Sequence, residues 1–111
     1  MIVKELSNLE GFTTISPGNG VLMITDAYVG DLLSDVMGNA PSESVLITIQ
    51  AHKNTVAVAS LAGIRALIIC NNRSTPQDMV EAAKEEEIAI FTTKDTQFEA
   101  SCKVAKALGK V

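Results

Sequence analysis

The sequence predicts an α/β fold in three layers, with a mostly parallel sheet built from β-α repeats and helices on both faces. Apolar runs centred near Ile47, Ile68 and Ile90 lie 21 and 22 residues apart, which leaves room for one strand, one helix and two short loops. Each interval therefore fits a right-handed parallel crossover. The runs are apolar on consecutive residues, as in strands that are covered on both faces. We expect all 111 residues to form one domain.

The amino-terminal part predicts a short helix and two strands. Residues 3–9 are amphipathic, and Gly11 provides a helix C-cap. Residues 12–16 alternate polar and apolar side chains and are rich in Thr and Ile, which indicates a strand. A turn cluster follows at residues 17–20, and residues 21–25 then predict a second strand that could pair with the first as a hairpin.

Residues 28–37 predict the next helix, because their apolar side chains recur at the helical spacing of three, four and seven. Gly38 is expected to close this helix. Asp26 and Asp31 suit a solvated loop and helix start, since acids near a helix N-terminus complement its dipole; a functional carboxylate pair is the alternative. The apolar positions of the helix are Val29, Leu32, Leu33 and Val36.

The middle of the chain predicts two buried strands with a helix between them. Residues 45–49 and 66–70 are apolar and largely β-branched or aliphatic, as buried strands are. Between them, Asn54 is expected to cap a helix that runs to about residue 62, and Gly63 ends it.

The last part begins with a strong helix-start signal. Thr75 supplies an N-cap and Pro76 the first helical residue, with an acid following in the first turn. Residues 88–91 then predict a strand and residues 96–108 a helix. The apolar stripe that should face the core on this last helix is Phe98, Cys102, Ala105 and Leu108.

The helix at residues 56–62 is apolar or small nearly all the way round, so it should be buried on two sides. In a chain this small the second cover could be another subunit, which predicts a homodimer. The alternative is complete burial within one protomer. The predicted dimer interface is Thr55, Val56, Val58, Ala59 and Ala62.

Composition excludes several classes of protein. The chain is 47% hydrophobic and 20% charged, as globular domains are, and its net charge of −4 with interspersed signs argues against nucleic-acid binding. Its longest apolar stretch, residues 55–70, is interrupted by Gly63 and Arg65 and is too short to span a membrane. No apolar signal core is found at residues 1–10, and Cys70 and Cys102 suit reduced thiols, so we expect a cytoplasmic protein.

Three polar loops follow the predicted parallel strands, where ligands bind in such sheets. A phosphate-bearing ligand contacted by His52, Lys53 and Arg73 fits this arrangement, because the first loop also ends at a helix N-terminus. Ordinary solvated loops are the alternative. The ligand-binding candidates are Gln50, His52, Lys53, Asn54, Asn71, Arg73, Thr92 and Thr93.

The sequence assigns no catalytic residue, metal or cofactor. His52 could act as a base only beside a nucleophile and an orienting carboxylate, and sequence spacing places neither next to it. One histidine and two cysteines leave little material for a metal site. The glycines at residues 18–20 lack the following helix that a phosphate-binding loop requires.

The order of these motifs resembles the DRTGG-domain family, which is related to the N-terminal domain of HPr kinase. The resemblance is carried by GDLL at residues 30–33, the segment 45–70, the Pro-led helix 76–87 and IAIFTTKDTQFEASCKV at 88–104. The namesake motif is not preserved, because QAHKN stands at residues 50–54 in place of the Asp-Arg pair. CNN stands at 70–72 in place of Thr-Gly-Gly. The chain therefore resembles a divergent, stand-alone member, with one DRTGG-like domain over residues 1–111.

The resemblance implies a non-catalytic regulatory or protein-interaction module that commonly self-associates. Such domains are found beside phosphotransacetylase catalytic domains and between CBS domains of regulated pyrophosphatases, so a partner enzyme is expected as well as a homodimer. Kinase activity is not implied, because the P-loop catalytic domain is missing. The alternative function is a sensor that binds a nucleotide or phosphorylated metabolite at the carboxyl ends of the parallel strands.

Overall fold

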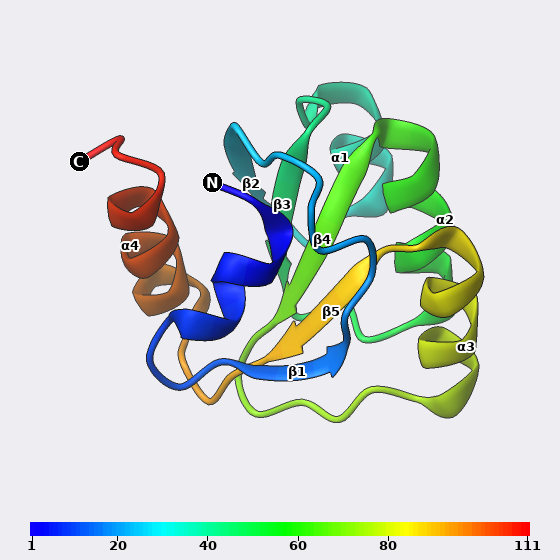
Figure 1. Ribbon diagram of the computed structural model, residues 1–111. Coiled ribbons are helices and arrows are strands. Elements are labelled where there is room, and N and C mark those ends of the chain that lie inside the picture. The colour runs from blue at the N-terminus through cyan, green and yellow to red at the C-terminus, as the bar shows by residue number, and fades with distance from the viewer.

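The computed structural model describes residues 1–111 and contains one five-stranded sheet in the order β1-β5-β4-β3-β2 (Figure 1). The strands are β1 (Thr13–Ser16), β2 (Asp26–Val29), β3 (Ser44–Thr48), β4 (Ile64–Ile69) and β5 (Ala89–Thr92). The helices are the 3-10 helix η1 (Val3–Asn8) and the α-helices α1 (Leu33–Asn39), α2 (Lys53–Ala62), α3 (Gln77–Glu86) and α4 (Gln97–Ala107).

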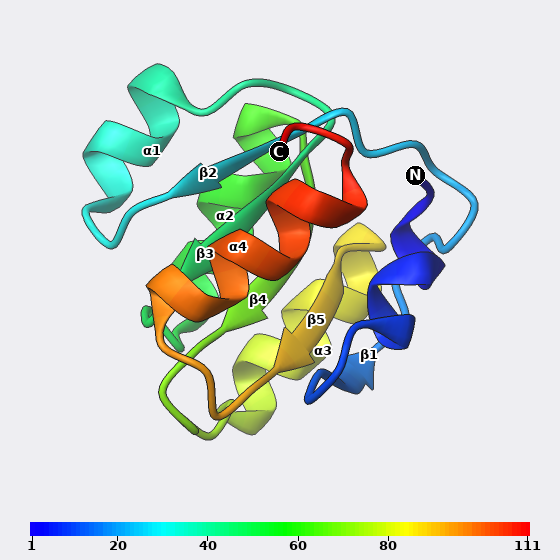
Figure 2. The same ribbon diagram turned by 90° about the vertical axis from the view of Figure 1, so that its left-hand side faces the viewer.

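Strands β2 to β5 are parallel, and β1 pairs antiparallel with β5. Leu46 of β3 pairs with Leu67 of β4, which pairs in turn with Ile90 of β5, so the crossovers predicted from the strand spacing are confirmed. Helices α1, α2 and α3 cover one face of the sheet, and η1 and α4 cover the other (Figure 2). The predicted three-layer α/β architecture is therefore confirmed.

Each central strand contributes side chains to both faces, which explains its unbroken apolar run. Val45 and Ile47 join the core beneath η1 and α4, together with Phe91 of β5. Leu46 and Leu67 join the core beneath α1, α2 and α3. None of the helices is both long enough and apolar enough to cross a bilayer.

The predicted amino-terminal hairpin is wrong. Strand β1 pairs with β5, with Thr13 opposite Thr92, and residues 17–25 pass along the sheet to β2 at the opposite edge (Figure 1). Within residues 21–25 only an isolated bridge between Ile2 and Met23 forms. Pairing with β5 is favoured because it covers a strand edge that would otherwise have unpaired backbone groups.

The boundary between β2 and α1 also differs from the prediction. Residues 26–29 form a strand, and the helix begins only at Leu33. Tyr28 pairs with Leu46 in the ladder and its hydroxyl donates to Asp35 at 2.6 Å, which fixes the end of the strand against α1. Gly38 lies inside α1 rather than after it.

The inward face of α4 differs in part from the predicted one, since Leu108 of the predicted stripe does pack against the core. Ala100 and Val104 are buried against the sheet, whereas Phe98 is 78% exposed and Cys102 is exposed. Thr96 and Glu99 form a capping box, with the Glu99 N–H donating to the Thr96 hydroxyl at 3.2 Å. This cap and the contact of Gln97 with the β2–α1 loop fix the rotation of the helix about its axis.

The apolar character of α2 results from its central place among the three helices on its face. It packs between α1 and α3 (Figure 1), so Thr55, Val56 and Ala59 are buried inside the protomer, and Val58 and Ala62 are half-buried. Three of the five residues predicted for a dimer interface are thus covered by their own chain. The outward side of α2 carries other residues, Ala57, Ser60 and Leu61.

Candidate functional site

The carboxyl ends of β3, β4 and β5 meet at one edge of the sheet, and the residues predicted to bind a ligand lie along it. Strands β2 to β5 follow one another in a single direction, without the reversal of strand order that opens a crevice in doubly wound sheets. The winding order therefore opens no crevice here. The predicted residues are Gln50, His52, Lys53 and Asn54 after β3, Asn71 and Arg73 after β4, and Thr92 and Thr93 at the end of β5.

The structure does not assemble the predicted phosphate-binding side chains. His52 caps α2, where its Nδ1 accepts the Asn54 N–H at 3.0 Å. Lys53 and Asn54 line a depression between α2 and α3, and Arg73 is exposed on another loop. No hydrogen bond joins His52, Lys53 and Arg73, and no pocket is lined by more than one of them.

Asp31 ties together three segments at this edge. Its Oδ1 accepts the Thr48 hydroxyl at 2.8 Å and the Ile49 N–H at 2.9 Å. The Gln97 side-chain amide, at the start of α4, donates to both carboxylate oxygens at 3.0 and 3.2 Å. The Gln50 side chain donates to the Asp31 carbonyl at 2.9 Å. Asp31 is therefore an organising residue of the edge, not the solvated loop residue that was predicted.

The contacts of Asp31 also set its protonation. Burial alone would raise its pKa, but the hydrogen bonds from Ile49, Thr48 and Gln97 and the positive charge of Arg73 outweigh this effect. The pKa of Asp31 is thus lowered from its usual 3.8. The stability that these contacts provide is present above that value, and it is lost as the pH falls through the lowered pKa.

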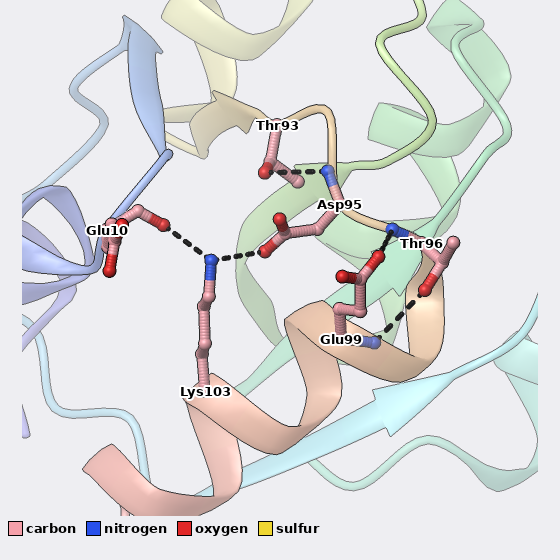
Figure 3. A network of polar contacts seen from close by, with 6 residues as sticks. All are labelled: Glu10, Thr93, Asp95, Thr96, Glu99 and Lys103. Atoms are coloured by element: carbon pink, nitrogen blue, oxygen red, sulfur yellow. Dashed lines mark hydrogen bonds and ion pairs between the residues drawn. The ribbon is translucent and has the colours of Figure 1, made fainter.

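A second network joins the amino-terminal part to α4 (Figure 3). The Lys103 ammonium forms an ion pair with Asp95 Oδ2 at 2.7 Å and donates to the Glu10 carbonyl at 2.8 Å. It lies 5.9 Å from the centre of the Phe12 ring. The hydrogen bond to Asp95 raises the pKa of Lys103 despite the opposing effect of burial. The Thr93 hydroxyl accepts the Asp95 N–H at 3.1 Å, which holds the carboxylate in place.

A polar pocket of about 330 Å³ lies beside this network, and none of its lining residues is hydrophobic. Of the predicted ligand-binding residues it includes only Thr92 and Thr93. The place of Thr13 in the pocket lining could not be predicted from the local sequence, because it depends on pairing with Thr92 of a distant strand. Asn72 is next to the predicted Asn71, and both have positive φ, of 57° and 61°. The complete lining is Gly11, Thr13, Asn72, Thr92, Thr93, Lys94 and Asp95.

The thiol of Cys70, directly after β4, is buried inside the protein. Burial raises its pKa from 9.0 to about 11, and the negative charges of Asp95 and Asp31 add to the rise. A thiol in this state is a poor nucleophile at neutral pH. The structure brings no three His, Cys, Asp or Glu side chains close enough to hold a metal ion.

Cys70 should make the protein less stable in alkali. A raised folded-state pKa gives stability that is complete below pH 9.0 and is lost as the pH rises toward about 11. The full loss from this thiol is about 2–3 kcal/mol of unfolding free energy. Urea unfolding across this pH range should show a smaller alkaline loss in Cys70→Ala than in the wild type.

The exposed Cys102 provides the matched control for this experiment. Cys102→Ala should behave as the wild type in this comparison, because it removes an exposed thiol and leaves the buried Cys70 in place. The same alkaline loss in Cys70→Ala and in Cys102→Ala would contradict the assignment to Cys70. Tyr28 and Lys103 also have raised pKa values. The quantity to compare is therefore the difference in alkaline loss of unfolding free energy between Cys70→Ala and Cys102→Ala.

Comparison with known proteins gives a structural likeness and no match in sequence. No protein-family model matches the chain, and no curated protein sequence matches it. Its structure is similar to that of the CBS and DRTGG domains of the regulatory region of Clostridium perfringens pyrophosphatase, solved in complex with the activator diadenosine tetraphosphate. The TM-score is 0.75 and the sequence identity 13%, and the match covers 96% of this chain and 46% of that chain.

The likeness supports a DRTGG-like fold, as the order of motifs predicted. It extends over nearly all of this chain. This chain spans less than half of the matched regulatory region.

Proposed function

We propose that this chain is a regulatory domain, which acts by binding other molecules and not by catalysis, and which associates with a second copy of itself. The observation that carries the regulatory role is the likeness over 96% of the chain to the regulatory region of a pyrophosphatase. That region was solved with a nucleotide activator, so control of a partner enzyme is the use we propose for this fold. Two free cysteines fit the cytoplasmic location that we propose with it.

The polar residues at the carboxyl edge favour binding over catalysis. Nδ1 of His52 is occupied as a helix cap, and Asp31 is held by three donors. Asp95 is paired with Lys103, and the Cys70 thiol is buried. None of these groups forms the nucleophile–base pair that covalent catalysis needs.

Exposed apolar side chains at the β2 edge support self-association. Leu32 is 68% and Phe98 is 78% exposed, and the hydrogen bond between Asp31 and Gln97 brings their chain neighbours together. Val29, at the end of β2, is 47% exposed. We call Val29, Leu32 and Phe98 the β2-edge patch. Because β2 has a strand neighbour on one side only, a second copy could pair with it about a twofold axis and cover the patch.

Phe98→Asp should convert a dimer of this chain into a monomer of 11.7 kDa, measured by light scattering coupled to size exclusion. A charge in the centre of an apolar contact is costly. The variant should fold, because residue 98 is in the first turn of α4, where an acid complements the helix dipole.

The control is Leu61→Asp, which changes an equally exposed apolar residue on α2. This variant should keep the wild-type mass. A wild-type protein that is monomeric at every concentration would refute self-association. A dimer that persists in Phe98→Asp would refute the β2-edge patch as its interface and leave the regulatory proposal intact.

A second candidate function is that of a small-molecule sensor at the carboxyl edge of the sheet. The polar pocket of about 330 Å³ favours it, since this volume lies within the range of about 300–1,000 Å³ for ligand sites. Arg73 and Lys53, proposed from the sequence as phosphate contacts, lie outside the pocket lining. A thermal shift with a small-molecule panel tests this candidate, because a ligand that binds only the folded state raises the melting temperature.

A further inference from the structure

The polar pocket has few groups free to bind an anion. The Asn71 N–H donates to the Asp95 carbonyl and the Asn72 N–H to the Thr93 carbonyl, both at 2.9 Å. The Asp95 N–H donates to the Thr93 hydroxyl at 3.1 Å. A phosphate site normally presents several free backbone N–H groups to its ligand. In this lining the N–H groups of Asn72 and Asp95 are used within the protein, and those of Gly11 and Lys94 remain free.

The start of α4 is also closed to an anion (Figure 3). The Thr96 N–H donates to the Glu99 carboxylate at 3.0 Å, and the Glu99 N–H donates back to the Thr96 hydroxyl. The carboxylate of the capping box therefore occupies the position that a phosphate would take at a helix N-terminus.

The charges beside the pocket are balanced. The Lys103 ammonium is held by the Asp95 carboxylate and the Glu10 carbonyl, so it is not free for a ligand (Figure 3). Lys94 is the one cationic side chain in the lining, and Asp95 is the one anionic side chain. An anionic ligand would gain the attraction of Lys94 and meet the repulsion of Asp95.

Hydroxyl and amide groups dominate the rest of the lining. Thr13 and Thr92 face each other across the β1–β5 ladder, and Thr93 and Asn72 complete the wall. The Thr93 hydroxyl oxygen already accepts a hydrogen bond, so its own O–H is free to donate. Hydroxyls and a side-chain amide both donate and accept, which matches ligands that carry several hydroxyl groups.

We propose that this pocket binds a neutral, hydroxyl-rich small molecule of the size of a monosaccharide or a cyclic polyol. The volume of about 330 Å³ is at the small end of ligand sites, which excludes an entire dinucleotide. This inference rests on the sensor candidate and specifies its ligand. It is independent of self-association at the β2-edge patch.

The test is a titration of the 15N-labelled chain, followed by NMR, up to tens of millimolar ligand. The ligands are D-ribose, D-glucose and myo-inositol, which we call the polyols. Inorganic phosphate and adenosine monophosphate are titrated separately. We expect one of the three polyols to shift the amide signals of Gly11, Thr13 and Thr93. Neither phosphate compound should shift them.

Two threonines on the same strand give matched variants. Thr13→Val removes a hydroxyl from the pocket lining, and binding of the polyol should weaken about fivefold to tenfold, as expected for one lost hydrogen bond. Thr14→Val makes the same change one residue away, outside the lining, and should leave the affinity unchanged. Lys94→Ala should change polyol affinity less than twofold, because a neutral ligand does not depend on that charge.

The remaining outcomes would overturn the inference in different ways. Phosphate or adenosine monophosphate binding in place of the polyols, with loss in Lys94→Ala, would refute the neutral ligand and keep the sensor. Equal weakening by Thr13→Val and Thr14→Val would refute the pocket as the binding place. A pocket whose signals respond to no probe would refute both the polyol site and the sensor candidate.

Discussion

Ala59→Glu is expected to unfold the protein. Ala59 is 0% exposed in the core beneath α1, α2 and α3, where it packs with Leu46 and Leu67. A glutamate there must either hold an unpaired charge in an apolar core or push α2 away from the sheet. The expected loss is about 4 kcal/mol or more of unfolding free energy, which is a large share of the stability of a small domain.

Urea unfolding followed by circular dichroism measures this loss, and Ala57→Glu is the control. Ala57 lies on the outward side of the same helix, so the same substitution should change the stability by less than about 1 kcal/mol. The pair also tests where α2 is covered. An Ala59→Glu protein that stays folded and only loses a partner subunit would show that this side of α2 is an interface between protomers.

Gly18→Ala should cost at least about 3 kcal/mol of unfolding free energy. Gly18 has φ +58°, and an added Cβ would overlap the backbone nitrogen of Ala89 and lie 2.8 Å from both Ala89 Cα and the Ile88 carbonyl carbon. These are main-chain atoms at the start of β5, so they cannot rotate away as a side chain would. Relief of the overlap requires the main chain to shift, either at residue 18 or at the start of β5.

Gly38→Ala is the matched control for this substitution. A Cβ at Gly38 meets nothing within 4 Å, and the residue lies inside α1 without a positive φ. This variant should be more stable by about 0.5–1 kcal/mol, because alanine loses less backbone entropy in a helix. Thermal unfolding compares the two variants, and a Gly18→Ala protein whose melting temperature equals or exceeds that of the wild type would contradict the packing at Gly18.

The sequence is sufficient to predict β3, β4 and β5 because each of these parallel strands has a strong local signal. The runs around Ile47, Ile68 and Ile90 are apolar on both faces, and the helices between them leave one crossover geometry. Strand β2 has no such signal. It is a four-residue edge strand that is half-exposed, with Tyr28 and Val29 at a spacing that also continues the helical pattern of α1.

Contacts between distant segments explain the other differences. Phe98 and Cys102 form a helical apolar stripe in the sequence, but the rotation of α4 depends on Gln97 reaching Asp31 across the molecule. Thr13 enters the pocket only because β1 lies beside β5. The positions of the loops with the polar edge residues were predictable from the ends of the strands. Tertiary packing decides which of these residues cap α2, line the depression between α2 and α3, or line the polar pocket.

The places of β1 and β2 at opposite edges of the sheet have a consequence for the order of folding. Strands β2 to β5 are neighbours both in sequence and in space, so each can dock on the one before it through a short loop closure. Strand β1 has no partner until β5 is in place, and its pairing closes a loop of most of the chain. Such non-local pairing is slow, because the entropy lost in closing the loop is not offset until the two strands have paired. The amino-terminal segment should therefore be the last part to fold and the first to open in the native protein.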